Sequence, residues 1–191
     1  MKTRLMVLLC LLAAFSIAAD KRYEANWPSI DSRPTPTWFT DAKFGIFIHW
    51  GAYSVPSYSR VGTYAEWYWH QLTKGPTDKG KPNPTWLFHT RNYGENFPYA
   101  NFIPMFRAEL FDPAYWAEVF QKSGARYVVL TSKHHEGFTL WPSQEADRSW
   151  GKPWNSVSVG PKRDLLGDLT NAVRAPGLKM GIYYSLYEWY N

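Results

Sequence analysis

Polar and aromatic side chains gather directly after three short apolar runs of this 191-residue sequence. The residues that could do chemistry there are His49 after the first run, His134, His135 and Glu136 after the second, and Tyr183, Tyr184 and Glu188 at or after the third. Imidazole, phenol and carboxylate groups form hydrogen bonds, so they suit a hydroxylated ligand. Any one of them taken alone could equally well be a half-buried side chain whose hydrogen bonds are formed within the protein. Three runs that deliver such groups to the same end of a sheet favour a site.

The spacing of these residues disfavours a metal centre. Neighbouring side chains on a strand point to opposite faces, so His134 and His135 cannot both bind one ion unless the strand has already ended. The sequence has no His-x-His, no His-Glu-x-x-His and no cysteine pair. It also has no Gly-x-Ser-x-Gly and no P-loop. We therefore expect no metal and no other cofactor. A metal-dependent hydrolase ranks only third among the possible functions, behind a metal-independent enzyme and a binding module.

A second cluster lies at residues 66–69, where Glu66 and Trp67 are followed by two more aromatic residues. A flat apolar ring beside a carboxylate suits a sugar, whose C–H face stacks on the ring while its hydroxyls form hydrogen bonds. The same pattern fits a helix start that packs aromatic rings into the core. The segment leaves these two interpretations open.

The three apolar runs predict the strands that position these groups. They span residues 44–48, 126–130 and 180–184, and they lack the polar alternation of a half-exposed sheet, which predicts a parallel sheet covered on both faces. Helices are expected from Asp112-Pro113 to Gly124 and from near Asp164 to Pro176-Gly177. Strand, helix, strand, helix, strand is typical of βαβ units.

The connections between these elements differ in length, and this favours one α/β architecture. The helix-to-strand links are very short, whereas the strand-to-helix segments cover about residues 50–111 and 131–163. Loops after the strands build the active site of (β/α)₈ barrels. A Rossmann-like sheet is disfavoured because Gly-x-Gly-x-x-Gly is absent. The sequence therefore predicts an α/β fold of the (β/α)₈-like (TIM) barrel type. Such a barrel needs about 250 residues, so residues 20–191 are expected to hold only its first three or so βα units, as the N-terminal part of a larger enzyme.

The N-terminus predicts a secretory signal peptide over residues 1–19. A short basic start is followed by an apolar run from Leu5 to Ala19 and then by polar residues. A membrane anchor would need about 20 apolar residues. We therefore expect a protein of the secretory pathway, lysosomal or extracellular, with no membrane association after cleavage.

The charge balance disfavours nucleic acid as a partner. The formal net charge is +5, and Lys2 and Arg4 lie in the predicted signal peptide, which leaves 19 basic against 16 acidic residues, or +3. This net charge is too small for the basic surface that a nucleic-acid-binding protein needs. The single cysteine, Cys10, is also in the predicted signal peptide, so no disulfide is expected.

Several motifs resemble those of the α-L-fucosidase family. They are KFGIFIHWG at residues 43–51, YVVLTSKHHEGFTLW at 127–141, WNSV at 154–157, GPKRD at 160–164 and GIYYSLYEW at 181–189. The resemblance runs from about Trp27 to the last residue and is most similar to the animal branch. It implies a retaining exo-glycosidase that removes terminal α-L-fucose from glycans, with a (β/α)₈-like barrel followed by a C-terminal β-sandwich that this chain is not expected to contain.

The resemblance also implies roles for individual residues. The matching sugar-binding positions are His49, His134 and His135, which bind fucose hydroxyls, Glu66 and Trp67, which line the same pocket, and one tyrosine of the third run, for which Tyr184 is chosen over Tyr183. The family's nucleophilic aspartate and its acid/base carboxylate lie on later strands, so no catalytic residue is expected within this chain. Retaining hydrolysis needs two carboxyl groups about 5–5.5 Å apart.

The expected partner is therefore a fucosylated glycan, and any oligomer would be a property of the full-length protein. The alternative hypothesis is a module that binds fucose without cleaving it.

Overall fold

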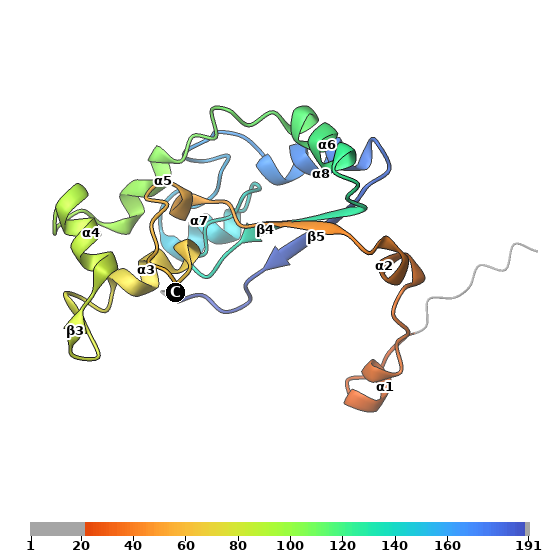
Figure 1. Cartoon of the computed structure of the whole chain (residues 1–191), viewed down its shortest axis with the longest axis horizontal. Coiled ribbons are helices and arrows are strands. Elements are labelled where there is room, and N and C mark those ends of the chain that lie inside the picture. Colours follow the sequence, from red (N-terminus) through yellow and green to blue (C-terminus); the bar gives the residue numbers. More distant parts are fainter. Residues whose placement is uncertain (1–21, 190–191) are drawn as a thin grey trace, which may run out of the picture. The chain divides into compact units, whose positions relative to one another are not determined.

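The computed structural model describes residues 22–189, so the predicted signal peptide lies outside the described residues. The chain divides after Thr37 into two units. The first contains helix α1 (Trp27–Asp31), which is capped by the Asn26 side chain accepting a hydrogen bond from the Ser29 amide. The second contains the sheet (Figure 1), and all the candidate site residues belong to it.

Three parallel strands form the sheet of the second unit. Their order is β1 (Gly45–Ile48), β4 (Tyr127–Lys133) and β5 (Lys179–Tyr184). The register aligns Phe47 with Val129 and Val129 with Gly181. The predicted strands are therefore confirmed, although β4 continues past the apolar run to Lys133, because these residues still pair with the end of β5.

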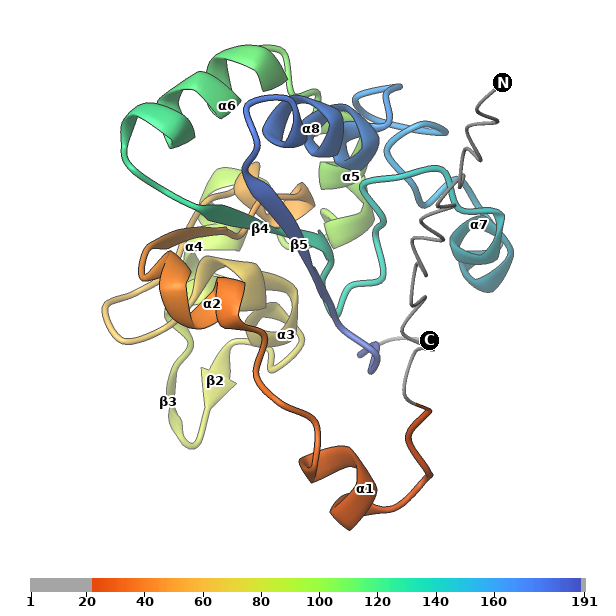
Figure 2. The ribbon, with the colours of Figure 1, turned by 90° about the vertical axis from the view of Figure 1, so that its right-hand side faces the viewer.

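Two helices cover one face of this sheet, as Figure 2 shows. Helix α6 (Pro113–Lys122) begins after Asp112, whose side chain accepts hydrogen bonds from two amides of the first turn, each at 3.0 Å. Helix α8 (Leu165–Arg174) begins after Asp164, which caps it in the same manner through the Gly167 amide at 2.8 Å. Both helices thus begin where the cap residues predict.

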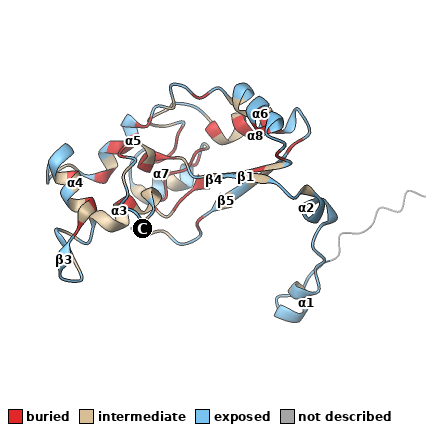
Figure 3. Cartoon of the chain, in the orientation of Figure 1, coloured by how far each residue is buried: buried red, intermediate tan, exposed pale blue. Residues whose placement is uncertain are grey.

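One part of the core lies between these helices and the sheet, where Figure 3 shows buried residues, and the buried cluster continues into the long connections. Its fully buried members include Val128, Leu130, Leu165, Leu169 and Val173, each 0% exposed. Burying each such side chain contributes about 1.5–3 kcal/mol. Val119 of α6 is 43% exposed. It borders an apolar hollow beside β1, because no described element covers this edge of the sheet.

The long connections contain short elements that the apolar pattern did not predict. Between β1 and α6 these are η1 (Ala52–Ser54), η2 (Ala65–Trp67), α3 (Tyr68–Leu72), the hairpin of β2 (Thr77–Asp78) and β3 (Lys81–Pro82), α4 (Pro84–Asn92), η3 (Tyr99–Asn101) and α5 (Phe102–Met105). Helix α7 (Gln144–Trp150) lies between β4 and α8. Helix α2 (Thr37–Ala42) precedes β1.

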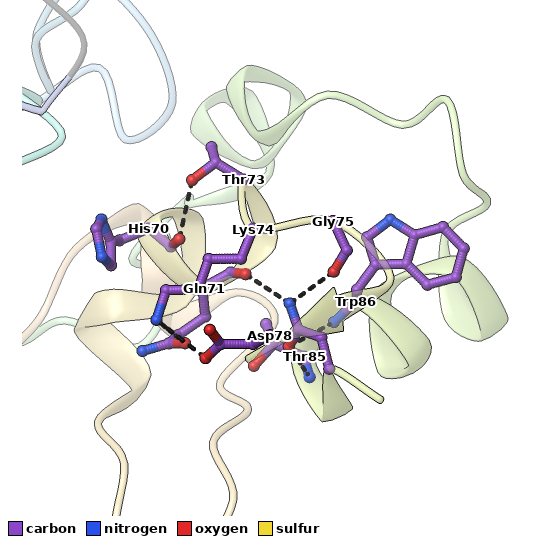
Figure 4. A network of polar contacts seen from close by, with 9 residues as sticks. His70, Gln71, Thr73, Lys74, Gly75, Asp78, Thr85 and Trp86 are labelled. Carbon is purple, nitrogen blue, oxygen red and sulfur yellow. Dashed lines mark hydrogen bonds and ion pairs between the residues drawn. The ribbon is translucent and has the colours of Figure 1, made fainter. Parts of the chain in front are cut away.

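One buried amide joins three of these elements. Asn83 is 2% exposed, and its Nδ2 donates to the carbonyls of Gln71 and Gly75 at 2.7 and 2.8 Å. Its Oδ1 accepts from the amides of Thr85 and Trp86 at the start of α4. Figure 4 shows the surrounding polar contacts. The side chain therefore ties α3 and the hairpin to α4 with its full hydrogen-bonding capacity.

The second face of the sheet is open, in contrast to the expected two-sided cover. Phe47 of the edge strand β1 lies on this face and is 54% exposed. A hollow of about 600 Å³ extends along this face, with Tyr127, Val129 and Gly181 in its lining. The described residues thus form a partial α/β fold with a parallel sheet that helices α6 and α8 cover on one side only.

We expect residues 20–191 on their own to self-associate through this open face, since exposed apolar strands favour aggregation. The substitution Phe47→Lys should increase the monomeric fraction in size-exclusion chromatography at matched concentration and lower the binding of a hydrophobic dye. Leu110→Lys is the control, because Leu110 is 96% exposed but lies off the sheet. A sharp thermal transition with a monomeric elution volume for the unaltered chain would contradict this expectation.

Asn83→Ala should open the segment from α3 to α4 locally, because it removes the side-chain hydrogen bonds to the Gln71 and Gly75 carbonyls and the cap of α4. Hydrogen exchange at the amides of Thr85 and Trp86 should accelerate about tenfold or more, while exchange in β4 stays unchanged. Asn92→Ala is the matched control, since Asn92 bonds only to the Phe88 carbonyl on the exposed side of α4. Equal exchange in the two variants would refute the role of Asn83.

Candidate functional site

Three aromatic rings from three different strands lie together at the carboxyl edge of the sheet. The ring centroids of His49 and His134 are 5.8 Å apart, and that of Tyr183 lies 5.6 Å from His49 and 5.9 Å from His134. The Tyr183 and His134 rings are stacked, with an interplanar angle of 20°. Parallel strands end at the same edge, so residues distant in sequence meet there.

Tyr184 lies apart from these rings. Its ring centroid is 6.1 Å from that of Trp141, and Lys133 Nζ is 4.4 Å from its centre. Successive side chains of a strand point to opposite faces, so only one of the two tyrosines can face the histidines, and it is Tyr183. The strand register distinguishes the two tyrosines. Phe47 and Gly181 are aligned across the sheet, and His49 and Tyr183 each lie two residues further along, so they share one face.

His134 and His135 both reach the site because β4 ends at Lys133. Their ring centroids are 4.8 Å apart and nearly perpendicular. The alternation that separates neighbours on a strand does not apply in the following turn. His135 Nδ1 lies 2.6 Å from the Tyr187 carbonyl oxygen. A carbonyl only accepts, so Nδ1 carries a proton, and Nε2 of the neutral ring is an acceptor.

Trp67 extends the cluster on the side of His135. Its ring centroid is 5.8 Å from that of His135 and 5.0 Å from that of Trp189, which itself stacks on His135 at 4.8 Å. Tyr68, the next residue of the segment, is 1% exposed and belongs to the core. The two side chains therefore differ: the Trp67 ring contacts the histidine, whereas Tyr68 packs into the core.

Electrostatics keep His49 neutral near pH 7. Burial lowers its pKa, the charge of Glu66 opposes that decrease, and the neighbouring His134 adds to it. Glu66 lies in η2, directly before Trp67, and is half-buried. A neutral imidazole can donate through one nitrogen and accept through the other, which is the capacity needed to bind a hydroxyl group.

An ion pair joins the ends of β4 and β5 behind the cluster. Lys133, which is 5% exposed, pairs with Glu188. The Ser185 amide donates to the Lys133 carbonyl at 3.0 Å, and the Trp189 amide donates to the His135 carbonyl at the same distance. The segment after β5 is thereby held against the two histidines.

Two further buried residues lie at the site: Glu136, which the sequence named as a candidate without a role, and Tyr53, which it did not name. Glu136 is 2% exposed, and its Oε2 lies 3.6 Å from His134 Nδ1. Tyr53 is 3% exposed, and its ring centroid lies 5.7 Å from that of His134. Burial raises the pKa of Tyr53, and the charges of Glu136 and Glu66 raise it further, so its hydroxyl stays protonated. The sequence signal for Glu136 was its position directly after His134 and His135.

The remaining aspartates near the sheet have structural partners. Asp147 accepts hydrogen bonds from residues 154–158, Asp164 caps α8, and Asp168 pairs with Arg163. Within residues 22–189, no three or more His, Cys, Asp or Glu side chains are grouped so that they could hold a metal ion.

The comparisons with known proteins agree on one family. The family profile described as α-L-fucosidase matches residues 10–191. The α-L-fucosidase of Branchiostoma floridae is 51% identical over 97% of this chain, and the human tissue α-L-fucosidase is 47% identical over 98%. The crystal structure of Thermotoga maritima α-fucosidase in complex with fucose matches 88% of this chain with a TM-score of 0.76 and 47% identity. The chain spans 38% of the length of each of these three proteins. Because the family profile covers nearly the whole sequence, the chain belongs to the α-L-fucosidase family.

Proposed function

We propose that this chain supplies the fucose-binding wall of an enzyme that hydrolyses terminal α-L-fucose from glycans with retention. One observation carries the proposal: His49, His134 and Tyr183 come from three parallel strands, and their ring centroids lie 5.6–5.9 Å apart. Such convergence of hydrogen-bonding side chains at strand ends is typical of barrel active sites.

The proposed ligand fits the chemistry of these groups. Fucose is a deoxy sugar that offers three ring hydroxyls and one methyl group. The histidines provide donors and acceptors for the hydroxyls, and the ring of Trp67 provides an apolar wall. Glu66 is proposed to line the same pocket. We assign the tyrosine of the sugar pocket to Tyr183 rather than to Tyr184, because the Tyr183 ring contacts the rings of two histidines.

The chain would contribute orientation and transition-state binding. Retaining hydrolysis needs a nucleophilic carboxylate and an acid/base carboxyl about 5–5.5 Å apart, and the resemblance assigns both to later strands. Hydrogen bonds that hold the sugar hydroxyls accelerate the reaction when they tighten as the ring flattens. The alternative, a module that binds fucose without cleaving it, uses the same groups and lacks only the two carboxylates.

We also propose that the sheet is part of a (β/α)₈-like barrel. Phe47, Val129 and Gly181 would then face the barrel interior, which accounts for their apolar or small side chains on the open face. The human relatives are named tissue and plasma α-L-fucosidase, which supports a lysosomal or secreted protein. No helix among the described residues is long and apolar enough to cross a membrane.

Residues 20–191 alone should not hydrolyse an aryl α-L-fucoside, because the two carboxylate roles are unfilled. The measurement is release of the aryl alcohol by the purified chain. Turnover that His134→Ala abolishes would overturn this expectation and place the catalytic pair within the chain.

The site assignment is best tested in a chimaera in which residues 20–191 are continued by the remaining C-terminal part of the Branchiostoma floridae relative. Tyr183→Phe, His49→Ala and His135→Ala should each lower kcat/KM about 5- to 150-fold, since an unpaired buried hydroxyl costs about 1–3 kcal/mol.

Tyr184→Phe is the matched control for Tyr183→Phe, because it removes the same atom from the neighbouring residue. It should leave kcat/KM within twofold of the unaltered chimaera. Melting temperatures are measured alongside, so that a loss of folding is not mistaken for a loss of binding. A larger effect at Tyr184 than at Tyr183 would refute the assignment.

A further inference from the structure

We propose that Glu136 is a positioning residue: its carboxylate holds His134 in the tautomer with the proton on Nδ1, so that Nε2 accepts a hydrogen bond from a ligand hydroxyl. The part that concerns the ligand rests on the proposed function. The part that concerns the tautomer rests only on the contacts of the two side chains.

The two groups face each other in a dry environment. Glu136 and His134 are each 2% exposed, and Oε2 of the carboxylate lies 3.6 Å from Nδ1 of the ring. Both atoms are buried, and neither has a hydrogen-bond partner among the described residues. A buried polar atom without a partner is costly, so each atom is the natural partner of the other. A small movement that shortens this contact to about 2.8 Å would pair both.

The chemistry of a carboxylate sets the direction of this bond. An ionised carboxylate can only accept, so Nδ1 must donate, and the neutral ring then has its lone pair on Nε2. His135 reaches the same tautomer by a different route, since its Nδ1 donates to the Tyr187 carbonyl. Two adjacent histidines would thus present two acceptor nitrogens, which suits neighbouring hydroxyl groups of a sugar ring.

The backbone around Glu136 is fixed by the core, which a positioning residue requires. Trp154, which is 1% exposed, donates from Nε1 to the Glu136 carbonyl at 2.9 Å. The Gly137 amide closes the turn by donating to the His134 carbonyl at 3.0 Å, with a φ of +78° that favours glycine. The carboxylate therefore has little freedom to leave His134.

Two further buried groups complete the surroundings of His134. The hydroxyls of Tyr53 and Thr131 are both buried without a hydrogen-bond partner among the described residues. Burial raises the pKa of Tyr53 and the charge of Glu136 raises it further, so the Tyr53 hydroxyl stays protonated. Neither hydroxyl forms a hydrogen bond with Nδ1 of His134, which leaves the Glu136 carboxylate as the acceptor for the Nδ1 proton.

The test measures the tautomer directly, in the chimaera labelled with ¹⁵N-histidine, with the His134 signals assigned by their loss in His134→Ala. The expected long-range ¹H–¹⁵N spectrum shows a protonated Nδ1 and an unprotonated Nε2 for His134. In Glu136→Met the Nδ1-protonated form should lose its dominance, whereas Glu136→Gln, which keeps an acceptor oxygen, should retain more of it. Glu145→Met is the control, because Glu145 is an exposed carboxylate of α7 that pairs with Arg148.

A double-mutant cycle separates positioning from general stability. Glu136→Met should lower kcat/KM about tenfold or more in the unaltered chimaera and have little further effect in a His134→Ala background. An equal loss in both backgrounds, or an unchanged tautomer in Glu136→Met, would overturn the proposal. A proton on Nε2 of His134 in the unaltered protein would overturn it without any variant. A chimaera without activity would refute the proposed function and leave the spectrum to decide the role of Glu136.

Discussion

The parallel register of β1, β4 and β5 is the constraint on which the rest of the structure depends. It aligns Phe47 with Val129 and Gly181, and the residues two positions further along β1 and β5 are His49 and Tyr183. A shift of one residue in either strand would turn its ring to the opposite face. The packing of Ile46 and Ile48 of β1 and of Met180 of β5 against the buried core opposes such a shift, so packing on one face fixes the chemistry on the other.

The regular elements could be predicted because their signals are local. Asp112 and Asp164 cap their helices, and apolar runs mark the strands. The elements between β1 and α6 could not be predicted, since most of them have two to six residues and are too short for a helical or strand period to show. Their order depends on long-range contacts such as those of Asn83, whose partners are up to 12 residues away.

The candidate site was predictable in its composition and only partly in its geometry. His49, His134 and His135 follow apolar runs, and this alone places them at strand ends. The choice between Tyr183 and Tyr184 needs the strand register, which a single sequence does not specify. Glu136 presented a different difficulty, because a carboxylate beside two histidines is equally compatible with exposure. Only its burial of 98%, set by the turn that Trp154 holds, distinguishes it from a surface group.

The alternation of side chains along the strands separates residues of the core from residues of the candidate site. On β4, Val128 and Leu130 contribute to the core, whereas Val129 belongs to the open face. The open face is expected to make the isolated chain self-associate, yet it is the face on which His49 and Tyr183 meet. A polar substitution there can relieve association without touching the core, and a substitution in the core can unfold the sheet without touching the rings. The tendency to self-associate and the candidate site therefore both arise from one uncovered surface. Further protein packed against the centre of that surface would prevent the self-association and would also enclose the candidate site.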